Sequence, residues 1–189
     1  MKKNNKKESV IIRRILFLLI LVVLLIGSSF AWYTVTLTGT KNNILKAGTL
    51  SLELDDQTAE GINLEKIIPV SDEEGMTYVP YSFTLKNNGN IDSEYSIYLD
   101  DVEIEEGKDR VEDKFIKYGI IKDNETPTIA LLSTTGQNPN RVIASGTITP
   151  NQTISYELRI WLDYDATNEA MDTIFKAKIR IEATQIKKQ

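Results

Sequence analysis

The residues best suited to chemistry lie in one acidic segment near the C-terminal end, Asp163-Tyr-Asp-Ala-Thr-Asn-Glu169. Side-chain oxygens occupy its first, third, sixth and seventh positions, which are Asp163, Asp165, Asn168 and Glu169. Calcium prefers such ligands, so these residues are candidates for a weak calcium site. The segment lacks the glycine and the final glutamate of an EF-hand loop, and it also fits a solvated acidic loop before a helical turn. The sequence supports both interpretations.

The chain has no histidine and no cysteine, and this limits its chemistry more than any motif does. The commonest general base and the commonest zinc ligands are missing, as are thiol nucleophiles and disulfides. A hydrolase that works through two carboxylates stays an alternative because acids are plentiful, but no pair of acids stands out. We therefore predict no enzymatic activity and no cofactor, and we predict no metal site beyond the calcium candidate.

Two other features are candidates for contacts with partners. Alternation in the segment around Trp161 predicts that this side chain points outward between Arg159 and Asp163. It either covers a neighbouring loop or lies at a subunit contact, where tryptophan is enriched. A second acidic run, which we expect to be a solvated face, consists of Asp100, Asp101, Glu103, Glu105 and Glu106.

The N-terminal segment, residues 1–31, has the order of a secretory signal. Residues 1–14 are basic, residues 15–26 form an uninterrupted apolar run, and small residues follow up to Ala31. This order predicts a signal peptide that is cleaved between Ala31 and Trp32. The alternative is an uncleaved membrane anchor, because the stretch from Ile15 to Trp32 approaches the lower limit of length for spanning a bilayer. In both cases the basic end stays in the cytoplasm, and the rest is extracellular or on the cell surface.

The charge of the remaining chain excludes one class of partner. Residues 1–31 hold six Lys or Arg and one acid, so residues 32–189 hold 16 of the 22 basic and 26 of the 27 acidic side chains, a net charge of −10. Such a domain gains nothing from counterion release on nucleic acid. We therefore expect no nucleic-acid partner.

Alternating apolar and polar residues dominate the chain after residue 31, which is the pattern of half-buried strands. The strongest alternation covers residues 50–55, 81–86, 95–100, 154–163 and 175–184. Weaker strands are predicted at residues 34–37, 118–122, 129–133 and 141–148, and short helices at 110–117 and 168–172. These elements predict an all-β fold, a jelly-roll-like antiparallel β-sandwich with one or two short helices, preceded by the N-terminal hydrophobic helix.

Several stretches, in order along nearly the whole chain, resemble the TasA/camelysin family of exported proteins from Gram-positive bacteria. They are Gly27-Ser-Ser-Phe-Ala-Trp-Tyr33, Ala47-Gly-Thr-Leu-Ser-Leu52, Tyr81-Ser-Phe-Thr-Leu-Lys-Asn-Asn-Gly-Asn90, residues 112–121 and Ile179-Arg-Ile-Glu-Ala-Thr-Gln185. The first looks like the junction that a SipW-type signal peptidase cuts. The zinc site of camelysin-like proteases cannot form here, because the chain has no histidine.

The resemblance implies a secreted subunit of cell-surface or biofilm-matrix fibres, in which an N-terminal strand of one subunit completes the sheet of the next. The expected partners are a SipW-type signal peptidase, further copies or sister subunits, and the membrane before cleavage. The donor strand would include Trp32, Tyr33, Val35 and Leu37. The expected organisation is a signal at 1–31, an extended arm at 32–48, the sandwich at 49–185 and a basic tail at 186–189.

Two alternatives to this interpretation remain. The arm, which is rich in β-forming residues, either adds to a neighbouring subunit or folds back as an edge strand of its own domain. The protein as a whole is either a fibre subunit or a membrane-anchored surface module that binds a partner without forming fibres.

Overall fold

The computed structural model describes Arg14 and residues 16–20, 34–38, 43–47, 50–56, 61–65 and 68–186. Residues 1–33 and residues 34–189 form two compact units. Arg14 and residues 16–20 are helical, and the rest of the predicted signal lies outside the described residues. Within the described part of the chain, the structure contains no helix with the length and apolar character needed to cross a membrane.

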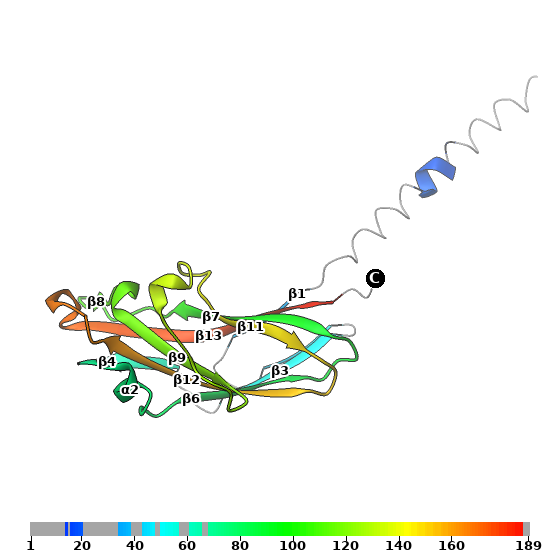
Figure 1. Cartoon of the computed structure of the whole chain (residues 1–189). Coiled ribbons are helices and arrows are strands. Elements are labelled where there is room, and N and C mark those ends of the chain that lie inside the picture. Colours follow the sequence, from blue (N-terminus) through cyan, green and yellow to red (C-terminus); the bar gives the residue numbers. More distant parts are fainter. Residues whose placement is uncertain are drawn as a thin grey trace, which may run out of the picture. The chain divides into compact units, whose positions relative to one another are not determined.

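The second unit is a sandwich of two sheets that lie face to face (Figure 1). The six-stranded sheet contains β1 (Thr34–Thr38), β4 (Ile62–Glu65), β7 (Ser93–Asp101), β8 (Asp109–Arg110), β11 (Val142–Ile148) and β13 (Thr173–Gln185). The seven-stranded sheet contains β2 (Asn43–Ala47), β3 (Leu50–Asp56), β5 (Pro69–Val70), β6 (Tyr81–Asn87), β9 (Ile116–Lys122), β10 (Thr128–Leu131) and β12 (Thr153–Asp163). The predicted all-β sandwich is confirmed.

Strand order places the long strands at the centre of each sheet. The first sheet runs β1-β13-β7-β11, and β4 and β8 also pair with β13. The second runs β10-β9-β12-β6-β3-β2, and β5 pairs with β12. The pairs are antiparallel except β5 with β12 and β8 with β13, which are short and parallel. The predicted antiparallel pattern therefore holds for all the longer strands described.

The core lies between the sheets and is formed by the alternating residues of the long strands. The inner face of β12 presents Ile154, Tyr156, Leu158, Ile160 and Leu162, and that of β13 presents Phe175, Ala177, Ile179, Ile181 and Ala183, all buried. Tyr156 also stacks on Phe83, with 5.2 Å between ring centroids. The period-two pattern of the sequence thus decides which side chains face the core.

The helices differ from those predicted. The expected helix at 110–117 is wrong, because β8 ends at Arg110, only Asp113–Phe115 forms a 3-10 turn, and β9 begins at Ile116. Val111 and Phe115 are both buried, Val111 from the link between β8 and the 3-10 turn and Phe115 from the last position of that turn. The turn predicted at 168–172 is a 3-10 turn at Asn168–Ala170, and another follows β10 at Leu132–Thr134.

One α-helical turn, α2 (Asp72–Gly75), was not predicted and explains the position of Trp161. Ser71 caps it by accepting a hydrogen bond from the Glu74 amide at 3.3 Å. The turn lies against the outer side of the seven-stranded sheet (Figure 1), where Trp161 is fully buried. A Cβ on Gly75 would lie 2.3 Å from the indole, so glycine is what lets the turn approach so closely. Trp161 therefore points outward as predicted and covers a neighbouring loop.

Candidate functional site at the sheet edges

The predicted N-terminal arm contributes strands to both sheets. In the six-stranded sheet β1 pairs antiparallel with β13, with Val35 opposite Ala183 and Leu37 opposite Ile181. In the seven-stranded sheet β2 pairs with β3. Within this single chain the arm therefore takes the folded-back position that the sequence left open. Ala31, Trp32 and Tyr33, the predicted cleavage site and start of the arm, lie outside the described residues.

β1 is an edge strand that lacks the usual protection. Among the described strands it pairs only with β13, and its sequence Thr-Val-Thr-Leu-Thr has no charge and no proline. The other edges are blunted in ways common to natural sheets. β2 contains Lys46, β4 contains Glu65, β10 has only four residues, and β11 has a bulge between Val142 and Ala144. β1 is thus the described edge that is best suited to pair with another chain.

The four predicted calcium ligands do not share one centre. Asp163 is buried and pairs with Lys117 at 3.1 Å, whereas Asp165 and Asn168 are exposed. Glu169 is exposed and lies 3.3 Å from the Lys114 ammonium. Within the described residues, no group of three or more acidic side chains is arranged to hold a metal ion.

The acidic run that begins in the last two residues of β7 divides into two parts. Glu103, Glu105 and Glu106 are exposed, as predicted for a solvated face. Asp100 and Asp101 instead bind arginines, which the run itself did not predict. Asp100 lies 2.7 Å from Arg180, whose guanidinium also stacks 4.0 Å from the centroid of the Tyr98 ring.

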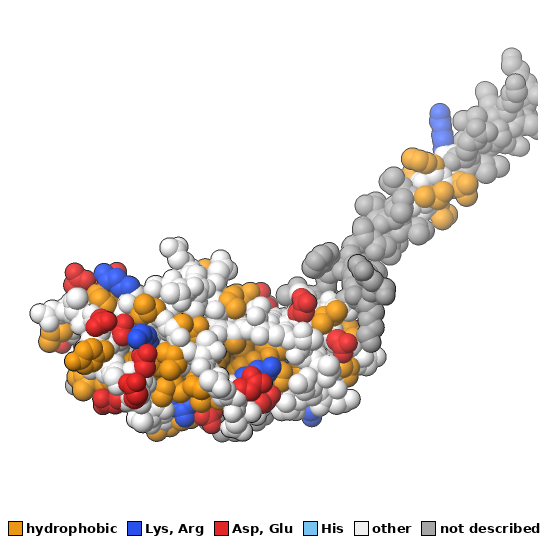
Figure 2. Space-filling view, in the orientation of Figure 1, with side chains coloured by type: hydrophobic (Ala, Val, Ile, Leu, Met, Phe, Trp, Pro, Cys, Tyr) orange, Lys and Arg blue, Asp and Glu red, His pale blue; other side chains and the backbone are white. Residues whose placement is uncertain are grey.

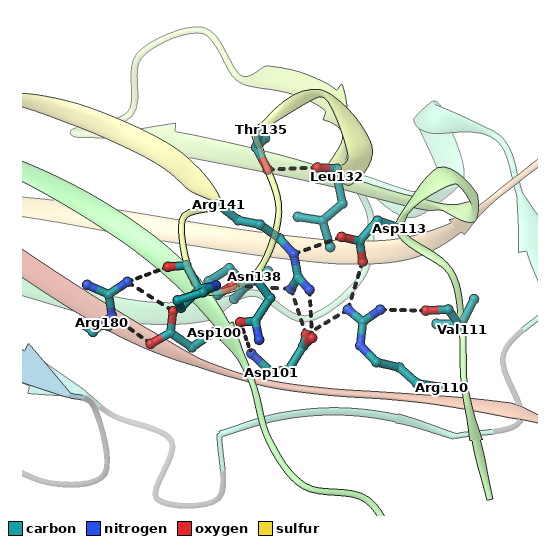
Figure 3. A network of polar contacts seen from close by, with 12 residues as sticks. Asp100, Asp101, Arg110, Val111, Asp113, Leu132, Thr135, Asn138, Arg141 and Arg180 are labelled. Atoms are coloured by element: carbon teal, nitrogen blue, oxygen red, sulfur yellow. Dashed lines mark hydrogen bonds and ion pairs between the residues drawn. The ribbon is translucent and has the colours of Figure 1, made fainter.

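Asp101 belongs to a partly buried ion cluster that joins three segments of the chain (Figure 3). Arg141, which is 2% exposed, makes two 2.7 Å contacts to the Asp101 carboxylate and lies 2.8 Å from Asp113. Arg110 lies 2.7 Å from Asp101 and 2.8 Å from Asp113. Two guanidinium groups and two carboxylates therefore neutralise one another at the end of β7.

This ion cluster anchors the loop between β10 and β11. Arg141 begins the return from that loop, and its carbonyl accepts a hydrogen bond from the Leu99 amide at 3.1 Å. Asn138 in the same loop accepts from the Asp101 amide at 3.1 Å (Figure 3). Burial lowers the pKa of Arg141, but the ion pairs with Asp101 and Asp113 outweigh that effect and raise it. The arginine therefore stays charged, and the cluster holds the loop between β10 and β11 against the end of β7.

A smaller ion pair holds α2 to the sheet. The Lys117 ammonium lies 3.0 Å from Asp72 on α2 and 3.1 Å from Asp163 on β12. The hydrogen bond to Asp72 is the main reason why the pKa of Lys117 is raised, although burial opposes it. In addition, Arg159 donates to the Tyr78 carbonyl at 2.9 Å. These contacts hold the segment that follows β5, including α2 and Tyr78, against the sheet where Trp161 is buried.

The ion clusters in the described part of the chain thus hold loops to the sheets. The distinctive surface feature is the unprotected edge strand β1. The signal that marks this edge in the sequence is the uncharged β-forming run of residues 34–38. Only one pair of the ion cluster is local in sequence, Arg110 with Asp113, whereas Asp101 and Arg141 lie 40 positions apart in the chain. No protein-family model matches the chain, and no curated protein matches it.

Proposed function

We propose that this protein is a secreted cell-surface structural protein whose copies assemble by β-strand addition through β1. The observation that carries the proposal is the edge position of β1, which has neither charge, proline nor bulge over Thr34–Thr38. A strand that pairs on one side only can leave its own sheet and take the same place in the sheet of another copy. Extracellular fibres or matrix are the expected product.

The pairing of β1 with β13 means that an exchange of β1 between copies has a low cost in free energy. In one chain β1 lies opposite Thr184 to Arg180 of its own β13. The same contacts form if β1 of one copy pairs with β13 of the next, since swapped elements keep their interactions. A head-to-tail exchange produces an open filament when its rotation does not close into a ring.

The N-terminal sequence supports export of this strand. A basic region, an apolar run and a small-residue end precede Trp32, as in a cleaved secretory signal. Cleavage there would leave β1 close to a new N-terminus, where an extended strand is free to leave its own domain. The alternative proposal, an anchored surface module without fibres, has its support in the length of the same apolar stretch.

The test is to image the extracellular form by electron microscopy and compare two matched double variants. V35K/L37D places charges opposite the buried residues Ala183 and Ile181, and should abolish filaments. T36K/T38D adds the same two charges opposite Glu182 and Arg180, where they meet opposite charges, and should leave filaments intact. Filaments that are equally abundant in both variants would exclude β1 as the assembling strand.

N-terminal sequencing of the cell-associated protein separates secretion from anchoring. A start near Trp32 is the result that the proposal requires. A start at Met1, together with a monomeric protein at high concentration, would favour the anchored surface module.

A further inference from the structure

A polar cleft opens between the two sheets on the side where β10 and β11 form their edges. It has a volume of about 260 Å³, just below the ~300 Å³ at which most ligand pockets begin, so it fits one small ring rather than a chain. Four residues with hydroxyl groups line it: Thr126, Thr128, Ser145 and Tyr156. Ile120 and Ile143 provide apolar surface. This side of the sandwich faces the viewer in Figure 2, where hydrophobic atoms lie beside charged ones.

A tight turn between β9 and β10 places two opposite charges on this cleft. The Glu125 amide donates to the Lys122 carbonyl at 2.7 Å, and Asp123 and Asn124 between them have positive φ of 45° and 64°. Aspartate and asparagine tolerate that conformation well. Both end residues of the turn, Lys122 and Glu125, line the cleft.

The turn is fixed to the neighbouring strand β12. The Asp123 amide donates to the Ser155 carbonyl at 2.9 Å, and the Asp123 carboxylate accepts from the Ser155 amide at 2.8 Å. At the base of the cleft, the buried hydroxyl of Tyr156 lies 2.6 Å from that of Tyr95. Turn and base are therefore held in place before any ligand arrives, which lowers the entropic cost of binding.

Lys122 is half-buried and has no carboxylate partner among the described residues; it shares this with Lys178, but only Lys122 of these two lines the cleft. Lys117, Lys176 and Arg159 each have a carboxylate partner, at 3.0, 3.6 and 3.0 Å respectively. Lys122 continues the alternation of Tyr118 and Ile120, whose side chains face the interior of the sandwich. An unpaired ammonium at the mouth of a hydroxyl-lined cleft is an anion-binding arrangement.

We propose that this cleft binds one acidic sugar unit, with its carboxylate on Lys122 and its hydroxyl groups on the serine and threonine side chains. The apolar surface of Ile120 and Ile143 would carry the C–H face of the ring, and Glu125 would accept from a ring hydroxyl. Glu125 would repel a dianionic phosphate more than a carboxylate, and this favours the sugar acid. The cleft uses no residue of β1, so sugar binding and filament assembly can fail independently.

The competing explanation is that Lys122 only guards a strand edge. β10 pairs with β9 no further than Ile120, and an inward-pointing lysine on exposed backbone discourages pairing with other chains. If Lys122 has only this protective role, its replacement promotes aggregation, and the cleft does not bind a ligand. Ligand titration therefore separates the two roles.

The experiment titrates sodium glucuronate into the full chain in detergent micelles and follows backbone amide resonances. Saturable shifts are expected at residues 120–126 and 143–146. Glucose, which lacks the charge, should bind at least about tenfold more weakly, as should glucuronate with the K122Q variant. The matched control is K178Q, because Lys178 is also half-buried without a carboxylate partner among the described residues but does not line the cleft.

Several results would overturn the proposal. Equal binding of glucose, or equal binding by K122Q, would show that the carboxylate does not meet Lys122. Equal affinity for sodium acetate would exclude recognition of the ring, and tighter binding of glucose 6-phosphate would exclude a carboxylate site. If no saturable shifts are seen and K122Q aggregates, Lys122 only protects the strand edge from pairing with other chains.

Discussion

Two groups of charged residues flank β10, one at the turn that precedes it and one at the loop that follows it, and they differ in whether their charges are paired. Around Asp101, two arginines and two aspartates form ion pairs with one another, and Arg141 is 2% exposed. At the β9–β10 turn, Lys122 and Glu125 face a cleft and have no ion-pair partner among the described residues. Both are fixed by backbone hydrogen bonds, so rigidity does not distinguish them.

The difference shows what each group is able to do. A buried charge that is already held in ion pairs has little capacity left to bind a ligand. Its removal leaves the partner charges without a compensating charge. An unpaired charge at a cleft costs little to replace but retains its capacity to bind. Mutations should therefore separate the two groups, with large effects on stability at the first and effects on binding at the second.

The largest loss of stability is expected for Arg141→Met. It removes three ionic contacts and leaves Asp101 and Asp113 with only Arg110 between them. Breaking a buried ion pair costs about 3–5 kcal/mol, which urea unfolding would measure. The control Lys178→Met removes a half-buried lysine outside any described ion pair and should cost less than about 0.5 kcal/mol. A small loss for Arg141→Met would refute the structural role of the cluster.

The next largest effect is expected for Lys117→Met, which leaves Asp163 buried without its cation. The expected loss is about 1–2 kcal/mol at neutral pH, after allowance for partial exposure to solvent. Because the pKa of Lys117 is raised in the folded state, its contribution is complete below the ordinary value of 10.5 and is lost as the pH rises through the folded value.

A comparison of the two proteins across that pH range tests the sign of this effect. The difference in unfolding free energy between wild type and Lys117→Met should shrink above pH 10.5. A difference that grows with pH would contradict the assigned ion pairs.

A smaller effect, about 1–2 kcal/mol, is expected for Asp123→Ala. It removes the acceptor for the Ser155 amide and puts alanine at a φ of 45°. Asp123→Asn keeps an acceptor oxygen and tolerates the conformation, so it should lose less than half as much. Thermal unfolding measures both, and equal losses would show that the side-chain hydrogen bond does not hold the turn.

The smallest effect on stability is expected for Lys122→Gln, within about 0.5 kcal/mol of wild type in urea. No described ion pair is broken by this change. A loss as large as that of Lys117→Met would place Lys122 with the structural charges and would remove the contrast between the two groups.

The sequence predicted the strands well because alternation reports burial directly, as in Ile154 to Leu162 on β12. It failed at residues 110–117 because a spacing of four between Val111 and Phe115 fits both a helix and an extended segment that turns once. Arg110 pairs with Asp113, a spacing that also fits a helix, and with Asp101, which lies outside the predicted helix.

The candidate sites were predicted unevenly for a similar reason. The β1 edge follows from an uncharged run in one segment, and the α2 turn has a local capping signal in Ser71 and Glu74. The cleft depends on which strands lie side by side, since Ser145 and Lys122 come from different sheets. Only the fold brings such residues together.

Disulfide trapping between two copies tests the central claim, that β1 pairs across chains, most directly. The chain has no cysteine, so T34C and T184C can be introduced into separate chains at register-paired positions of β1 and β13. One chain carries an isotope label, and mass spectrometry identifies the linked peptides. T147C on β11, at the other edge of the same sheet, is the control partner.

The proposed strand addition predicts linked T34C and T184C peptides from two differently labelled chains in the filaments, and none between T34C and T147C. Filaments without the first link, or with both links at equal yield, would contradict the account.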